Sequence, residues 1–379
     1  MKKSRRNFLK GMVAASGAAL LGSFAPWPSA RARAQGGDGG IEFIIAVMME
    51  NRSFDHFLGW LPGADGVQDG LTYLDCDGVP HDTMPLAPDF TGESHPNPDQ
   101  SYGAGRQQYN GGAMDGFLCA GSNDELAIGY YGEEDRPYFN RLARHFTTLD
   151  RYFCSILGPT FPNRFFANAA QTDRLDNSPK LATMPTIWDS LAKAGVSGAY
   201  YSEGSGFLAR WGSKYDSIRL PYTQFLKDAA AGTLPAVSFV QAMPSVDDDH
   251  HPADVRVGDE FLRNTVRAVG SGPAWPNAVI LITYDEWGGF FDHVAPPRAD
   301  APNDVDPDLV DGKALLGFRV PTVLVSPFSV GDPKNPRVNS LVFDHTSILK
   351  LIEWRWGLDP LTARDASEDI NNLTLALDL

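Results

Sequence analysis

Nearly continuous apolar runs alternate with amphipathic stretches along most of the chain. The runs are rich in β-branched residues, which is typical of strands buried on both faces of a sheet. Strands are predicted at 41–49, 198–201, 236–240, 278–284 and 320–326. Helices are predicted at 186–194, 259–269 and 346–356. Strands that alternate with helices predict one α/β domain over residues 35–379, with a mostly parallel central sheet flanked by helices.

Residues 60–125 interrupt this pattern because they are rich in Gly, Pro, Asp and Asn. We interpret them as long loop excursions over the active-site face and not as a separate domain. In parallel sheets, ligands bind beyond the carboxyl ends of the strands. The polar residues that directly follow two predicted strands are therefore the first candidates for a site.

Glu50 and Asn51 follow the first strand, and Asp285 and Glu286 follow the strand at 278–284. Carboxylate and carboxamide oxygens suit Mg²⁺, Ca²⁺ or Mn²⁺. Adjacent carboxylates after a buried strand repel each other unless a cation or a proton relieves them. The alternatives are that Glu50 and Asn51 cap the next helix and that the acidic pair forms an ordinary turn.

Thr160 lies in Gly-Pro-Thr-Phe-Pro-Asn-Arg, just before the N-terminus of a predicted helix that has Pro162 in its first turn and runs to about Gln171. Free N–H groups and the helix dipole favour phosphate at such a position. A hydroxyl there can attack phosphorus if a metal or a base activates it. The alternative is a threonine that only caps the helix.

Histidines supply the remaining candidates. His251 lies in an acidic loop with Asp247 to Asp249, where an imidazole can bind phosphate oxygens or protonate a leaving group, although a solvated loop explains the pattern equally well. His95 is a weaker candidate, and His293 follows the acidic pair by seven residues. His345 precedes the last helix and is expected to support the site from behind.

Charge and the N-terminus narrow the class of protein. The 379 residues carry a net charge of −15, and residues 1–34 contain seven Lys or Arg and no acid, so the remainder is more acidic still. Such a surface argues against nucleic-acid binding.

The N-terminus has the features of a cleaved Tat signal over 1–34: the paired Arg5 and Arg6, a short apolar stretch and Ala32-Arg33-Ala34. We therefore expect the Tat translocase as a transient partner and a periplasmic or secreted product. An uncleaved anchor is the alternative.

The three cysteines, Cys76, Cys119 and Cys154, allow at most one disulfide within the chain. Their spacing leaves open which two residues pair. No two of them have CxxC spacing, so a cysteine-based zinc site is not expected.

Five segments, taken in order, resemble the bacterial phosphoesterase family of non-haemolytic phospholipases C and a related acid phosphatase. The segments are Glu-Asn-Arg-Ser-Phe-Asp at 50–55, Gly-Gly-Ala-Met-Asp-Gly-Phe at 111–117, Gly-Pro-Thr-Phe-Pro-Asn-Arg at 158–164, Thr-Tyr-Asp-Glu at 283–286 with Asp-His at 292–293, and Asp-His-Thr-Ser at 344–347. The resemblance spans about residues 41–356 and implies an alkaline-phosphatase-like α/β core. Arg106 and Tyr109 stand where the phospholipases usually have a histidine and a tryptophan.

The resemblance assigns roles to the candidates. It implies one divalent metal ion on Glu50, Asn51, Asp285 and Glu286, Thr160 as the nucleophile, and His95, His251 and His293 around the phosphate. We therefore expect a metal-dependent hydrolase that cleaves phosphodiesters of phosphatidylcholine-like lipids through a phosphothreonine, with His251 protonating the leaving alcohol. The alternatives are an acid phosphatase that acts on phosphomonoesters and a non-catalytic metal-binding protein.

Overall fold

The computed structural model describes residues 39–379. Contacts divide the chain into Met1–Arg31 and Ala32–Leu379, and every described residue belongs to the second part. The predicted signal at 1–34 lies outside the described residues. Over the described range, no helix has the length and apolar character needed to cross a bilayer.

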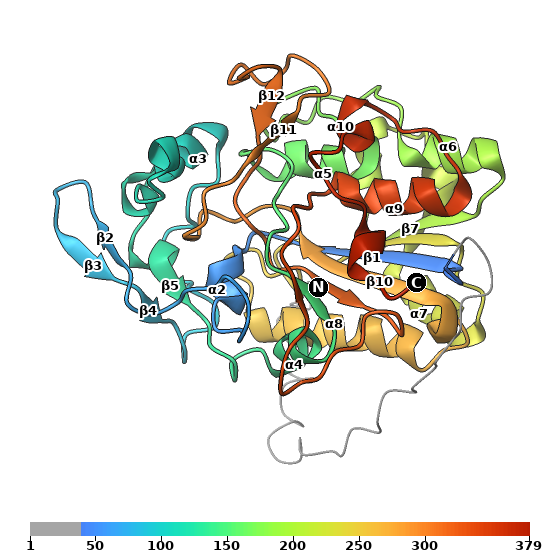
Figure 1. The fold of residues 1–379 in the computed structure, drawn as a ribbon, viewed down its shortest axis with the longest axis horizontal. Coiled ribbons are helices and arrows are strands. Elements are labelled where there is room, and N and C mark those ends of the chain that lie inside the picture. Colours follow the sequence, from blue (N-terminus) through green and yellow to red (C-terminus); the bar gives the residue numbers. More distant parts are fainter. Residues whose placement is uncertain (1–38) are drawn as a thin grey trace, which may run out of the picture. The chain divides into compact units, whose positions relative to one another are not determined.

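Within residues 39–379 an eight-stranded sheet forms the centre of the fold (Figure 1), in the order β14-β6-β13-β10-β1-β9-β7-β8. Its strands are β1 (Phe43–Met49), β6 (Thr147–Leu149), β7 (Gly198–Ser202), β8 (Arg219–Pro221), β9 (Val237–Gln241), β10 (Ala278–Tyr284), β13 (Val323–Val325) and β14 (Val338–Asn339). All neighbouring strands pair in parallel except at β13, which is antiparallel to both β10 and β6. The predicted α/β class with a mostly parallel sheet is confirmed.

Helices cover both faces of this sheet. In Figure 1, α5, α6 and α9 lie on one side of it, and α4, α7 and α8 lie on the other. The helices are α2 (Phe54–Leu58), α3 (Tyr102–Tyr109), α4 (Pro137–His145), α5 (Thr160–Ala169), α6 (Ile187–Ala194), α7 (Tyr222–Ala231), α8 (Val255–Gly270), α9 (Thr346–Trp356) and α10 (Ala363–Ala366). The helix at 346–356 has the predicted bounds, whereas α8 begins four residues before the predicted start, where the side chain of Asp254 caps it.

Burial of the central strands explains why the sequence forms them. Every residue of β10 is buried, as is every residue of β1 after Phe43. Each fully buried Ile, Val or Leu contributes about 1.5–3 kcal/mol of transfer free energy. β1 and β10 pair residue by residue from Phe43–Ala278 to Met49–Tyr284. Both strands therefore end at the same edge of the sheet, and their next residues leave it side by side.

The excursion between α2 and α4 contains short elements of its own. They are the strands β2 (Thr72–Leu74), β3 (Pro80–Asp82), β4 (Met84–Pro85) and β5 (Gly129–Tyr130), together with α3. β2 and β3 form a hairpin that extends away from the central sheet in Figure 1. A disulfide joins Cys76 to Cys119, and Cys154 is buried and free. A further short pair, β11 (Arg298–Asp300) with β12 (Lys313–Leu315), lies beyond β10.

Candidate active site

The site is built where β1 and β10 end. The backbone N–H of Asp285 donates to Met49 O (3.2 Å), and that of Arg52 donates to Glu286 O (3.0 Å), so the pairing of the strands continues past their ends. The N–H of Asn51 also donates to Asp285 Oδ1 (3.2 Å). The four residues predicted as metal ligands, Glu50, Asn51, Asp285 and Glu286, thus lie together at one edge of the sheet.

Asn51 is held in an unusual conformation. Its φ is +62°, a left-handed value that asparagine tolerates better than most residues. Its side chain is buried, and neither Oδ1 nor Nδ2 has a hydrogen-bond partner among residues 39–379. Gly288, with φ +67°, packs against it: a Cβ at Gly288 would lie 2.2 Å from Asn51 O. A strained, buried and unsatisfied carboxamide is expected where a ligand completes the site.

The acidic pair is costly to keep charged. Burial, and next the charge of Glu50, raise the pKa of Asp285 well above its ordinary value. Burial, and next the charge of Asp285, do the same to the pKa of Glu286. Glu286 Oε2 accepts from the N–H of Gly288 (2.6 Å), while its Oε1 is buried without a partner in the described part of the chain. Orphaned oxygens on mutually repelling carboxylates fit a divalent cation, which would relieve both defects.

Thr160 is the first residue of α5 and not the residue before it, as the sequence had suggested. Its Oγ1 donates to Glu50 Oε1 (3.0 Å), and its side chain is 7% exposed. The hydroxyl therefore faces Glu50, one of the predicted metal ligands. The hydroxyl of Thr160 and the carboxylate of Glu50 are thus neighbours at the start of α5.

Arg164 is a central residue of the site to which the sequence reasoning gave no role. Its Nε donates to Asp285 Oδ2 (2.8 Å), and its Nη2 donates to Glu50 Oε2 (2.7 Å). Burial acts to lower the pKa of the guanidinium, but Asp285 and Glu50 outweigh it and hold that pKa above its ordinary value. Arg164 stands four residues after Thr160, and this i, i+4 spacing on one helix face was the signal that could have revealed it.

His345 supports the site from behind. Its Nε2 lies 2.6 Å from Asp285 O, and burial lowers the pKa of the ring to about 4, so neutral Nε2–H donates to that carbonyl. Asp344 Oδ1 accepts from the N–H of Thr346 (2.7 Å) and so caps α9. The expectation that His345 stabilises the site without binding substrate agrees with these contacts.

His251 lies on a loop that is hydrogen-bonded to the site. The N–H of Glu50 donates to Asp248 O (2.9 Å), and His251 Nε2 lies 2.8 Å from Gly92 O. Burial lowers the pKa of His251. His95 is oriented by Asp124, with Nδ1 2.8 Å from Oδ2. In the described structure, neither ring has a hydrogen bond to Thr160 or Glu50.

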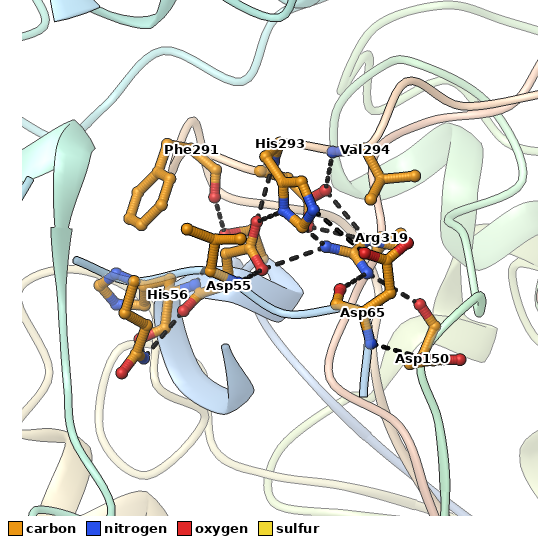
Figure 2. A network of polar contacts seen from close by, with 12 residues as sticks. Asp55, His56, Asp65, Asp150, Phe291, His293, Val294 and Arg319 are labelled. Atoms are coloured by element: carbon orange, nitrogen blue, oxygen red, sulfur yellow. Dashed lines mark hydrogen bonds and ion pairs between the residues drawn. The ribbon is translucent and has the colours of Figure 1, made fainter. Parts of the chain in front are cut away.

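His293 belongs to a different network, shown in Figure 2. Its ring faces Asp55, with Nδ1 2.5 Å from Oδ2, and its Nε2 lies 3.3 Å from Asp65 Oδ1. Burial acts to lower the pKa of His293, but the bond to Asp55 outweighs it and raises that pKa. The structure joins His95 to Asp124 and His293 to Asp55, and within residues 39–379 neither ring is hydrogen-bonded to Thr160.

Asp55, Asp292 and His293 form a second candidate metal cluster, because one ligand atom of each lies within 4.8 Å of the others. Arg319 already lies in it, with Nη2 3.1 Å from Asp55 Oδ1 (Figure 2). Its Nε is 2.9 Å from Asp292 Oδ1. Burial is the main influence on Asp292 and raises its pKa to about 7, although Arg319 acts in the opposite direction. Because a fully buried guanidinium balances these carboxylates, the cluster has less need of a metal than the one at Glu50.

A cavity of about 560 Å³ opens beside the start of α5. Residues 97–103 and 175–177 form most of its wall, and Pro159, which directly precedes Thr160, also lines it. The N–H of Phe161 donates to Asn177 Oδ1 (2.8 Å), which ties the second wall segment to the helix. The lining combines polar side chains such as Asp99 and Asn177 with apolar Pro98, Pro159 and Leu175, so the cavity can contact both polar and apolar groups.

Known proteins resemble this chain over most of its length. The Phosphoesterase family matches residues 41–359. Non-specific phospholipase C6 of Arabidopsis thaliana is 33% identical over 377 residues, covering 86% of this chain and 70% of that protein. Phospholipase C A of Mycobacterium tuberculosis is 33% identical over 430 residues, covering 94% of this chain and 81% of that protein.

Among solved structures, the lipoteichoic acid synthase LtaP of Listeria monocytogenes matches with a TM-score of 0.44 at 10% identity, covering 87% of this chain and 75% of that one. The family match covers nearly all of the described residues, and the relatives are named phospholipases C. The chain belongs to the Phosphoesterase family and is a phosphoric ester hydrolase.

Proposed function

We propose that the protein is a metal-dependent phosphodiesterase of phospholipase C type that works through a phosphothreonine on Thr160. One observation carries the proposal: the Thr160 hydroxyl at the start of α5 donates to Glu50 at the end of β1, 3.0 Å away. This contact puts a nucleophile, a helix N-terminus and a cluster of buried carboxylates at one point.

Glu50, Asn51, Asp285 and Glu286 would hold one divalent cation, whose identity among Ca²⁺, Mg²⁺ and Mn²⁺ the oxygen donors leave open. When bound, such an ion supplies Lewis-acid stabilisation of phosphoryl oxygens and lowers the pKa of a nearby hydroxyl. The unpartnered atoms of Asn51 and Glu286 support this assignment.

In the proposed reaction, Thr160 Oγ1 forms the new bond to phosphorus as the bond from phosphorus to the ester alcohol breaks. The hydroxyl proton passes to Glu50 Oε1, the acceptor that it already faces. The first N–H groups of α5 favour the negative phosphoryl group through the helix dipole. Attack of water on the phosphothreonine then releases the phosphoryl product and restores the hydroxyl.

We assign the proton for the leaving alcohol to His251. Its Nε2 faces the Gly92 carbonyl, so Nδ1 is the nitrogen that can exchange a proton with the alcohol. A lowered pKa makes its imidazolium a stronger acid. His95 is proposed to contact the phosphate, and the same role for His293 would require its ring to leave Asp55.

The names of the relatives favour lipid phosphodiesters as substrates. A phosphatase that acts on phosphomonoesters is the second candidate, because the cavity next to Pro159, the residue directly before Thr160, has room for a small ester. The third alternative from the sequence, a non-catalytic metal-binding protein, disagrees with membership of a family whose named relatives are phospholipases C.

Purified protein assayed on phosphatidylcholine and on p-nitrophenyl phosphate, each with and without EDTA, separates these candidates. We expect phosphocholine release that EDTA abolishes and Mn²⁺ restores. Thr160→Ala should lose at least about 10³-fold in kcat, whereas Thr160→Ser should keep measurable activity. Turnover of the monoester alone supports the phosphatase, and turnover of neither substrate would contradict both substrate assignments. Full activity of Thr160→Ala would refute the mechanism.

We also propose export through the Tat system. The paired arginines support it, and the Cys76–Cys119 disulfide is typical of an oxidising compartment. Cell fractionation tests it. Wild type should be found in the periplasm or medium, and a variant with Arg5→Lys and Arg6→Lys should stay in the cytoplasm; equal distribution of the two would contradict the proposal.

A further inference from the structure

Arg164 lies between the two strand ends of the site. Its guanidinium reaches Asp285 through Nε (2.8 Å) and Glu50 through Nη2 (2.7 Å), and Nη2 also donates to Met49 O (3.2 Å). The side chain is 3% exposed and comes from the helix that begins with Thr160. One cation on the nucleophile's helix thus holds the carboxylates that end β1 and β10.

We infer that Arg164 is a positioning residue that acts as a built-in counter-charge of the metal site. Three buried or nearly buried carboxylates, those of Glu50, Asp285 and Glu286, meet here, and Arg164 is the guanidinium that pairs with two of them. One positive charge against three ionised carboxylates leaves a net charge of −2, which a divalent cation would neutralise. This role rests on the proposed metal site.

The hydrogen bonds show how Arg164 can stay in place when the cation binds. Its Nη2 donates to Oε2 of Glu50, and the other oxygen, Oε1, accepts the hydrogen bond from Thr160. It gives Asp285 Oδ2 one hydrogen bond, and a carboxylate oxygen has two lone pairs. The arginine therefore fixes the two carboxylates without using all of their donor capacity.

A purely structural role predicts something different. If Arg164 only tied α5 to the sheet, its loss would destabilise the protein equally with and without metal. If it is a counter-charge, its loss leaves three carboxylates to repel one another, and a bound cation then relieves a larger repulsion than it does in wild type. Metal would stabilise such a variant more than it stabilises wild type.

The test is thermal unfolding of wild type, Arg164→Met and Arg164→Lys, each in EDTA and in saturating Mn²⁺, with Mn²⁺ affinity measured by calorimetry. For Arg164→Met we expect a loss of Tm in EDTA that is at least about twice the loss in Mn²⁺, and a Kd for Mn²⁺ at least about threefold lower than that of wild type. Its kcat on phosphatidylcholine should fall while KM changes little, because the carboxylate facing Thr160 is no longer held. Arg164→Lys keeps the charge, so its stabilisation by Mn²⁺ should stay near that of wild type.

Arg319→Met provides the matched control. Arg319 is also a buried arginine that bridges two carboxylates, Asp55 and Asp292, but it does so in the other cluster. It should lose the same Tm in EDTA as in Mn²⁺. Equal losses in Arg164→Met, or weaker Mn²⁺ binding, would overturn the counter-charge role while the metal site stood. A wild type that neither binds Mn²⁺ nor is stabilised by it would overturn the metal site and this role together.

Discussion

Gly288 is the position where one added methyl group should test the construction of the site. A Cβ there would lie 2.2 Å from Asn51 O, 2.6 Å from Asn51 C and 2.8 Å from Asn51 Cα. All three are backbone atoms, which cannot rotate away as the end of a flexible side chain can. Gly288 also has φ +67°, where residues with a Cβ are strained.

The expected cost of Gly288→Ala has two parts. A left-handed conformation costs an L-residue about 1–2 kcal/mol. Forcing extra volume into a packed region costs a further 1–3 kcal/mol or so, here by displacing the backbone of Asn51. Gly195→Ala isolates the first part, because Gly195 has φ +70° and nothing lies within 4 Å of a Cβ added there. We therefore expect a free energy of unfolding about 2–5 kcal/mol lower for Gly288→Ala and about 1–2 kcal/mol lower for Gly195→Ala.

Urea unfolding of both variants measures these costs as shifts in midpoint at constant m-value. Calorimetric titration with Mn²⁺ supplies the second readout, in which Gly288→Ala should bind at least about tenfold more weakly and Gly195→Ala should bind like wild type. If the two variants lose the same stability and both keep full Mn²⁺ affinity, then Asn51 is not held by Gly288 and the proposed ligand geometry is refuted.

Two further predictions concern buried charges. Burial and nearby Arg52 hold the pKa of His56 well below its ordinary value, and its Nδ1 bonds Gly129 O (2.7 Å). As pH falls below about 6.5, His56 is therefore protonated in the unfolded state before it is protonated in the folded state. Wild type should then lose up to about 1.4 kcal/mol of stability per pH unit more than His56→Phe loses. Urea midpoints of the two proteins that change in parallel between about pH 7.5 and 5.5 would contradict this. Removing the cation in Arg319→Met should lower the free energy of unfolding by about 3–5 kcal/mol, because buried Asp55 and Asp292 are left uncompensated.

An exposed ion pair provides the control for Arg319. Arg151 and Asp65 are 3.2 Å apart, but their side chains are 41% and 45% exposed. Solvent screens such a pair, so Arg151→Met should cost less than about 1 kcal/mol. A comparable loss in the two variants would mean that burial does not set the value of these pairs.

Much of the fold followed from the pattern of the sequence. The apolar run at 278–284 has the observed bounds of β10, and Gly195 ends α6 as expected. The run at 320–326 gave only the short β13, which runs against its neighbours. Strand direction could not be predicted there, because an apolar run reports burial and carries no information about which way the chain enters the sheet.

The site was predictable to the extent that it sits at strand ends. Glu50 and Asp285 meet because two parallel strands in register end together, and each apolar run in the sequence stops at the residue before them. The partners of His95 and His293 were not predictable, because they depend on where long loops fold back. Arg164 was visible in its motif, but only the structure shows that its charge pairs with Glu50 and Asp285 at the ends of two strands.

Two buried acidic clusters in one protein show how a ligand site differs from a structural ion-pair network. Around Asp55, Arg319 and backbone N–H groups donate to the carboxylate oxygens, and no oxygen of Asp55 or Asp292 is orphaned within residues 39–379. Around Glu50, a similar arginine balances two carboxylates, yet the amide of Asn51 and an oxygen of Glu286 stay buried without partners. Folding alone has satisfied the first cluster. The second cluster retains buried polar atoms that a cation could bind, and a hydroxyl lies next to it. This difference is why we place the chemistry at Thr160 and not at His293.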